Sequence, residues 1–136
     1  MPNRARILLV VASIIAASQS GVALADCLHW NVAGTPLGGD LRLHRFPGPP
    51  NYEDVATGDK EEEDFVLHLK QPVCVNGEDD IQGAITERDV LAVQLLVPDD
   101  KRDSFRDQVG KTIVVRGKLF ARHTGHHHTA VLLEIE

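Results

Sequence analysis

Four of the seven histidines in this chain fall within six residues, in the segment His-Thr-Gly-His-His-His from His123 to His128. A neutral imidazole can bind a metal ion, and a protonated imidazole can pair with a carboxylate. Apolar stretches typical of β-strands flank the segment on both sides. The pattern therefore indicates a cluster of imidazoles at the tip of a hairpin, although it names no substrate.

A second segment that could do chemistry is an acidic loop, residues 47–64. It begins with Pro47-Gly48-Pro49-Pro50 and ends with the acidic run Asp59 to Asp64. Eighteen residues without evident secondary structure exceed the usual loop length in a compact domain, which favours a functional or disordered segment. A glutamate run by itself is typical of a solvated loop.

Apolar and polar residues alternate over several short stretches, and we find no long amphipathic helix in the sequence. We expect strands at residues 37–44, 65–70 (with an extension to 75), 90–97, 113–121 and 129–135. A short helix between the third and fourth strands should end at Gly110. This order predicts an all-β chain, a small five-stranded OB-fold-like Greek-key barrel with one short helix. A generic antiparallel sandwich is the main alternative.

In an OB-fold, the loops between strands one and two and between strands four and five flank the same face. The histidine segment and the acidic loop are therefore expected to meet. The hydrophobic pattern of the last two strands predicts that Leu119 lies opposite Val131. That register places His123 opposite His127, with His126 in the turn.

Three interpretations of the histidines remain open. They could bind zinc or copper, with the candidate metal ligands His123, His126, His127, His128 and Glu53. They could be a structural clasp that hydrogen-bonds the carboxylates of the acidic loop with no ion. They could also contact a ligand or partner directly, on a face formed by Tyr52, Glu53, Asp54, Arg122, His123 and His127.

The first 25 residues have the pattern of a secretory signal peptide. Arg4 and Arg6 precede an apolar stretch, and Ala23-Leu24-Ala25 predicts cleavage after Ala25. A lipoprotein signal and an uncleaved anchor helix are weaker alternatives. We therefore expect a periplasmic or secreted chain, with residues 26–136 in a single domain and no membrane span after cleavage.

The charge of the expected mature chain argues against a nucleic-acid partner. The whole chain has 14 basic and 20 acidic residues, and the signal segment holds two of the basic residues and none of the acidic ones. Removing two positive charges from a net charge of −6 leaves −8. Because phosphate contacts provide most nucleic-acid affinity, a chain this acidic is not expected to bind nucleic acid.

The two cysteines, Cys27 and Cys74, both lie in the part expected to be exported. In an oxidising compartment such a pair usually forms a disulfide, which is our prediction. A redox-active or metal-ligating thiol pair is the alternative.

Several motifs occur together along the chain: Phe46-Pro47-Gly48-Pro49-Pro50-Asn51-Tyr52-Glu53, Gly58-Asp59, Gln71-Pro72-Val73-Cys74-Val75, Val109-Gly110-Lys111 through Gly117-Lys118-Leu119-Phe120, and His123 to Thr129. In this combination the chain resembles an exported bacterial family, the domain of unknown function 4431. Members of that family often have Ser at the position of Asp54 and Pro at the position of Ala130, and neither change removes a candidate ligand. The resemblance implies an OB-fold-like envelope protein and brings no activity with it.

The sequence therefore favours a non-enzymatic binding module, expected to be a monomer, whose partner is an unknown envelope protein or small ligand. A metal-binding envelope protein using the same residues is the alternative. A metal-assisted hydrolase with Glu53 as its base is a weaker one. We find no serine or cysteine motif for nucleophilic catalysis in the sequence.

Overall fold

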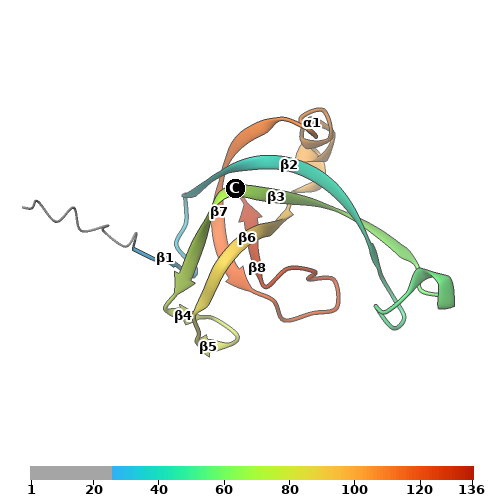
Figure 1. Cartoon of the computed structure of the whole chain (residues 1–136), viewed down its shortest axis with the longest axis horizontal. Helices are drawn as coiled ribbons and strands as arrows, with labels where there is room; N and C mark the ends of the chain where they lie inside the picture. Colours follow the sequence, from blue (N-terminus) through green and yellow to red (C-terminus); the bar gives the residue numbers. More distant parts are fainter. Residues whose placement is uncertain (1–25) are drawn as a thin grey trace, which may run out of the picture.

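The computed structural model describes residues 26–136 (Figure 1). The predicted signal peptide lies outside the described residues. The described part is mostly β, and its elements are β1 (Leu28–His29), β2 (Thr35–Pro47), η1 (Val55–Thr57), β3 (Glu61–Asn76), β4 (Glu78–Asp79), β5 (Gly83–Ala84), β6 (Glu87–Leu96), η2 (Asp99–Lys101), α1 (Arg102–Arg106), β7 (Thr112–Ala121) and β8 (Val131–Ile135). All five predicted strands are present. The short helix lies between the third and the fourth of them, as predicted, but it ends at Arg106 and not at Gly110. No helix in residues 26–136 is long and apolar enough to cross a bilayer.

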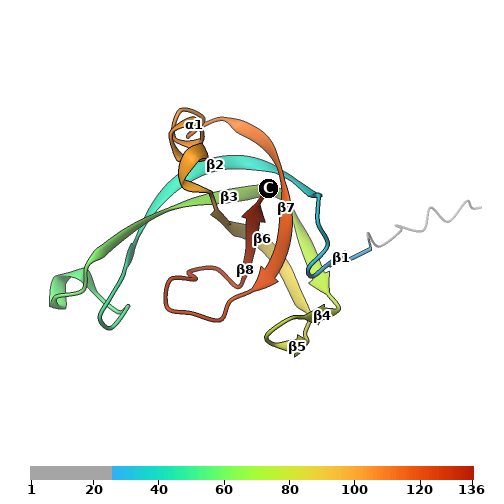
Figure 2. The same cartoon turned by 180° about the vertical axis from the view of Figure 1, so that it is seen from behind.

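Six strands form one mixed sheet in the order β1-β3-β2-β7-β8-β6, with a further pairing between β3 and β6. The pairs β1–β3 and β6–β8 are parallel, and the other pairs are antiparallel. Figures 1 and 2 show β2 and β3 as long, curved strands that run side by side. A separate hairpin consists of β4 and β5.

The sheet has six strands and not the predicted five, because the short strand β1 joins it. Leu28 and His29 pair in parallel with Val75 and Asn76 at the end of β3. The adjacent Cys27 forms a disulfide with Cys74, which confirms the predicted pairing. Closing a loop of this length stabilises a small domain by about 2–4 kcal/mol. A two-residue strand is too short for hydrophobic alternation to predict.

The predicted boundaries of the acidic loop, 47–64, are wrong. Strand β2 continues to Pro47 and β3 begins at Glu61, so the connection is residues 48–60 and contains η1. The end of the acidic run belongs to β3, where Glu63 pairs with Arg45 of β2. The Arg45 guanidinium lies 3.5 Å from the Glu61 carboxylate and 3.8 Å from that of Glu63. Such cross-strand ion pairs reduce the repulsion within the run and are compatible with a strand.

The predicted register of the last two strands is also wrong, by two residues. Leu119 pairs with Leu133, and Ala121 pairs with Val131. A shift of two residues keeps every side chain on its own face, so the hydrophobic pattern could not distinguish the two registers. As a result, residues 122–130 form a longer loop, and His123 and His127 are not cross-strand partners.

The core lies on one face of the curved sheet and includes Leu41, Phe65, Leu67, Leu119 and Leu133, all fully buried. Trp30 packs against it with 4% exposure and donates its Nε1–H to the Ile85 carbonyl oxygen.

A second buried patch lies outside this core cluster. Val66 and Leu132 are 2% and 0% exposed, and each pairs with Gln94 across the sheet. Their side chains lie on the face opposite to the core, because they alternate with core residues along their strands. The loop between β7 and β8 is hydrogen-bonded to Gln94 of this patch.

Candidate metal site on the histidine loop

The loop of residues 122–130, called the histidine loop below, is fixed to β6 by Gln94. The Gln94 side chain is 1% exposed. Its Nε2 donates to the His126 carbonyl oxygen at 2.9 Å, and its Oε1 accepts from the His128 backbone N–H at 2.6 Å. The Gln94 backbone N–H in turn donates to the Thr129 hydroxyl at 2.9 Å. One buried side-chain amide therefore fixes the loop backbone on either side of His127.

This path brings His128 to two carboxylates of β3. The imidazole is only 10% exposed, and its Nε2 lies 3.1 Å from Glu62 Oε2 and 3.6 Å from Asp64 Oδ2. Its ring stacks on Phe46 of β2, with the ring centroids 4.2 Å apart and an angle of 7° between the planes. Phe46 pairs with Glu62 across strands β2 and β3, so the pairing of these two strands positions both the stacked ring and the carboxylate. The orientation of the His128 ring is therefore fixed before any ligand binds.

His126 contacts the other oxygen of the same glutamate. Its Nδ1 lies 2.5 Å from Glu62 Oε1, and its Nε2 lies 3.0 Å from the Tyr52 hydroxyl. Gly125 permits this contact, because a β-carbon there would lie 2.9 Å from the Tyr52 ring. Each oxygen of Glu62 therefore has an imidazole partner, and one of these imidazoles is held by a tyrosine.

The loop that carries Tyr52 is organised by Asp59, a residue that is 5% exposed. It accepts the backbone N–H groups of Asn51, Glu53 and Asp54 at 2.8, 2.8 and 3.0 Å. These hydrogen bonds, first that from Glu53 and then that from Asn51, hold the pKa of Asp59 below its ordinary value. A charged, hydrogen-bonded Asp59 thus fixes the backbone on both sides of Tyr52.

The side chains of Glu62, Asp64 and His128 together have the character of a metal site. Each offers a ligand atom, and the three atoms lie within 4.8 Å of one another. Imidazole nitrogen and carboxylate oxygen are ordinary ligands of zinc, and around a tetrahedral ion two such atoms lie about 3.3 Å apart. The distances from His128 Nε2, 3.1 and 3.6 Å, lie on either side of that value. The residues present therefore fit a divalent ion.

Electrostatics at the site favour a cation. Burial raises the pKa of Asp64, and the negative charge of Glu62 raises it further, while the charge of a protonated His128 would lower it. The folded chain therefore holds a carboxylate that is disfavoured in its charged form. A bound cation would relieve that cost.

This cost predicts that Asp64→Asn stabilises the metal-free protein. A pKa raised by folding means that the folded state binds the Asp64 proton more tightly than the unfolded state, so stability falls as the pH rises through the folded value. At neutral pH, with a chelator present, the variant should have a free energy of unfolding about 1 kcal/mol above wild type. Urea denaturation measures this, with Asp107→Asn on an exposed carboxylate as the control. A clearly less stable Asp64→Asn would contradict the prediction.

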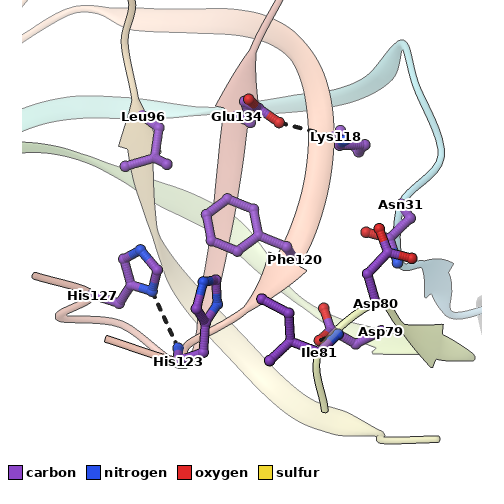
Figure 3. Close-up of a pocket in the computed structure, with 10 residues that line it drawn as sticks. All are labelled: Asn31, Asp79, Asp80, Ile81, Leu96, Lys118, Phe120, His123, His127 and Glu134. Atoms are coloured by element: carbon purple, nitrogen blue, oxygen red, sulfur yellow. Dashed lines mark hydrogen bonds and ion pairs between the residues drawn. The ribbon is translucent and has the colours of Figure 1, made fainter. Parts of the chain in front are cut away.

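The other two histidines of the loop lie at a separate pocket (Figure 3). His127 Nδ1 accepts the backbone N–H groups of His123 at 3.1 Å and Thr124 at 3.3 Å. The rings of His123 and His127 meet edge to face, with centroids 4.5 Å apart. The histidine cluster is therefore divided into two pairs with different surroundings.

His127 is expected to make folding sensitive to acid. Burial, followed by the charges of His123, His126 and His128, lowers the pKa of His127. A lowered folded pKa means that the unfolded state takes up the proton first, so this contribution to stability is present above the ordinary histidine pKa and is lost as the pH falls through the folded value. In urea denaturation, His127→Gln should therefore lose less stability than wild type between neutral and mildly acidic pH. Equal losses in the two proteins would contradict this assignment.

The predicted metal ligands are thus only partly brought together. His126 and His128 lie beside carboxylates, whereas His123 and His127 lie at the separate pocket. The Glu53 side chain is exposed, and none of the hydrogen bonds found in residues 26–136 joins it to a histidine.

The predicted partner face is divided as well. Tyr52 contacts His126, but Asp54 caps η1 by accepting the Ala56 backbone N–H. Arg122 is exposed, and its carbonyl oxygen accepts from Gln82 Nε2.

Sequence reasoning missed Glu62, Asp64, Phe46 and Gln94. Gln94 gave a signal, since it is the polar residue within an otherwise apolar stretch from Val90 to Val97. Glu62 and Asp64 were assigned to a loop, where their alternation carries no meaning. In a strand, the same spacing places both side chains on one face.

Comparison with protein families found one match, described as a domain of unknown function (DUF4431), over residues 92–136. Comparisons with curated proteins and with solved structures found no significant match. The matched segment runs from β6 to the end of β8, so it includes Gln94 and the whole histidine loop. The motifs before residue 92, including Phe46 to Glu53, lie outside the match. Residues 92–136 therefore match the domain of unknown function 4431, which is the family that the sequence motifs predicted.

Proposed function

We propose that this chain is an exported, non-enzymatic module that binds zinc through His128, Glu62 and Asp64. The observation that carries the proposal is the convergence of one imidazole and two carboxylates, from segments more than sixty residues apart, at distances that suit one ion. These ligands leave a fourth position, which water or a group from a partner would fill.

The neighbouring residues support the same assignment. Side chains that orient a metal-binding group are themselves usually hydrogen-bonded. His126 contacts Oε1 of Glu62, the oxygen that His128 does not contact, and Tyr52 hydrogen-bonds His126. The stacking of Phe46 and the hydrogen bond from the His128 backbone to Gln94 fix the imidazole. The ligands would therefore need little rearrangement to bind an ion.

The structural clasp is the competing account. A protonated His128 would hold Glu62 and Asp64 by charge and hydrogen bonds, with no ion. The two accounts differ in one measurable way: zinc must displace the proton from His128 Nε2, because an imidazole binds a metal only through an unprotonated nitrogen.

We favour a binding role over the hydrolase alternative. Metal-assisted hydrolysis needs a base positioned near the ion. Glu53, the predicted base, is exposed, and both oxygens of Glu62 have imidazole partners.

We also propose export and an OB-like barrel. The signal-peptide pattern and the disulfide support a periplasmic or secreted location. The successive pairings β2–β3, β3–β6, β6–β8, β8–β7 and β7–β2, with β6–β8 parallel, support the barrel. The partner would be an envelope protein or small ligand, and copper is the second candidate ion.

Calorimetric titration of untagged residues 26–136 with zinc tests the proposal. We expect saturable binding at one site at micromolar or lower zinc. In buffers of different ionisation enthalpy, the measured heats should show proton release, and the affinity should fall in mild acid. No saturable uptake at micromolar zinc would remove the metal function and leave the clasp.

A further inference from the structure

The pocket on the other side of the histidine loop lies between that loop and the β4–β5 hairpin (Figure 3). Its volume is about 280 Å³, which suits a small ligand or one side chain of a larger one. Phe120 lies in the middle of the view, with His123 and His127 on one side and Asp79 and Asp80 on the other. The pocket shares no lining residue with the metal site proposed above.

The charged groups at the pocket are mainly acidic. Asp79, Asp80 and Glu134 line it, and Lys118 is the only lysine or arginine among its lining residues in the described chain. Lys118 Nζ already lies 3.6 Å from the Glu134 carboxylate. The remaining charge is therefore negative, and an anionic ligand would be repelled.

Asp79 and Asp80 differ in their partners. Asp79 is 5% exposed and accepts the backbone N–H groups of Ile81, Gln82 and Ala121. Burial opposes its charge, but these hydrogen bonds outweigh burial and leave the pKa of Asp79 below its ordinary value. Asp80 is exposed, and none of the hydrogen bonds or ion pairs within residues 26–136 uses its carboxylate. Asp79 thus supplies a fixed negative charge, and Asp80 supplies a carboxylate able to accept hydrogen bonds.

The pocket also has an apolar wall. Phe120 is half-buried, and Ile81 is 63% exposed although it is a large aliphatic residue. Leu96 completes this part of the lining. A ligand with an apolar stem could cover Ile81 and Phe120.

Backbone contacts fix the tautomers of the two imidazoles. His123 Nδ1 lies 3.0 Å from the Ala121 carbonyl oxygen, which can only accept, so this nitrogen carries the proton. The Nε2 of neutral His123 is consequently an acceptor. His127 Nδ1 accepts two backbone N–H groups, so its proton lies on Nε2. The pocket therefore contains one imidazole acceptor, His123 Nε2, for an N–H group of a ligand.

We infer that this pocket binds an organic cation, an ammonium or guanidinium group on an apolar stem. The carboxylates of Asp79 and Asp80 supply the opposite charge, His123 Nε2 accepts an N–H, and Phe120 and Ile81 contact the stem. A cation near the Phe120 ring gains further attraction from the aromatic quadrupole. This inference does not depend on zinc, and it stands or falls separately from the proposed function.

The test uses three probes with the same phenyl group and different charges. 2-Phenylethylamine is the cation, 2-phenylethanol the neutral analogue and 3-phenylpropionate the anion. Each is titrated into residues 26–136 with chelator present, and binding is followed by the shifts of backbone amide signals in NMR spectra. We expect the amine to bind at least about 10-fold tighter than the alcohol, with the largest shifts at residues 79–81 and 120–127. The anion should bind most weakly.

Asp80→Asn should weaken amine binding about 5–10-fold, whereas Asp107→Asn should leave it unchanged. Both carboxylates are exposed, so neither change should disturb folding. A peptide with one internal lysine, acetylated at its N-terminus, distinguishes the source of the cation. Binding by this peptide identifies a protein side chain, and binding by the free amine alone identifies a small amine. Equal binding of amine and anion, shifts elsewhere, or no shift at about 10 mM amine would overturn the inference.

Discussion

Replacing His128 with alanine is expected to weaken zinc binding by at least about 100-fold. His128 supplies the one nitrogen ligand of the proposed site, and its imidazole is the group that lies between Glu62 and Asp64. Two carboxylates without it would form a weak oxygen site with little preference for zinc. Competition with a chelating zinc indicator at neutral pH measures the loss.

His123→Ala is the matched control, since it removes a histidine from the same loop but on the side of the separate pocket. It should change the zinc affinity by less than about threefold. Equal losses in the two variants would mean that the ion is held elsewhere in the loop. Unchanged affinity in His128→Ala would contradict the assigned ligands.

Replacing Gln94 with leucine is expected to lower the free energy of unfolding by about 2–4 kcal/mol. Leucine has a similar size but cannot hydrogen-bond, so the His126 carbonyl and the His128 N–H would both lose their partner. Each polar group left unpaired in a buried place costs about 1–3 kcal/mol. Urea denaturation at neutral pH, with chelator present, measures the change.

Gln108→Leu is the control, because within residues 26–136 the Gln108 side chain hydrogen-bonds only the carbonyl of Ser104, at the surface. It should cost less than about 1 kcal/mol. In Gln94→Leu, the amide hydrogens of the histidine loop should also exchange faster than in wild type. A variant with unchanged stability and unchanged exchange would show that Gln94 does not hold the loop.

The strands could be predicted because a strand with one buried face alternates apolar and polar residues along its sequence. Leu37, Leu41 and Phe65 lie in the core where the period of two placed them. The disulfide followed from two cysteines in a chain expected to be exported. The strand β1 could not be predicted, because two residues show no period.

The sequence predicted that the histidine segment and the acidic segment meet, but it did not predict which side chains contact one another. Hydrophobic alternation fixes the face of a side chain but not its position along the strand, so it could not exclude a register shifted by two residues, and the predicted pairing of His123 with His127 was wrong. Glu62 and Asp64 were missed because an acidic run looks like a loop until the cross-strand arginine is known. The position of the loop depends on Gln94, whose partners are backbone groups and leave no trace in the sequence.

Anomalous X-ray scattering from crystals of residues 26–136 grown with zinc tests the central claim most directly. We predict one strong zinc peak within about 2.0–2.2 Å of His128 Nε2 and of one oxygen each from Glu62 and Asp64. His126 should remain hydrogen-bonded to the other oxygen of Glu62. A peak bound to His123 or His127, or no peak in crystals saturated with zinc, would contradict the account.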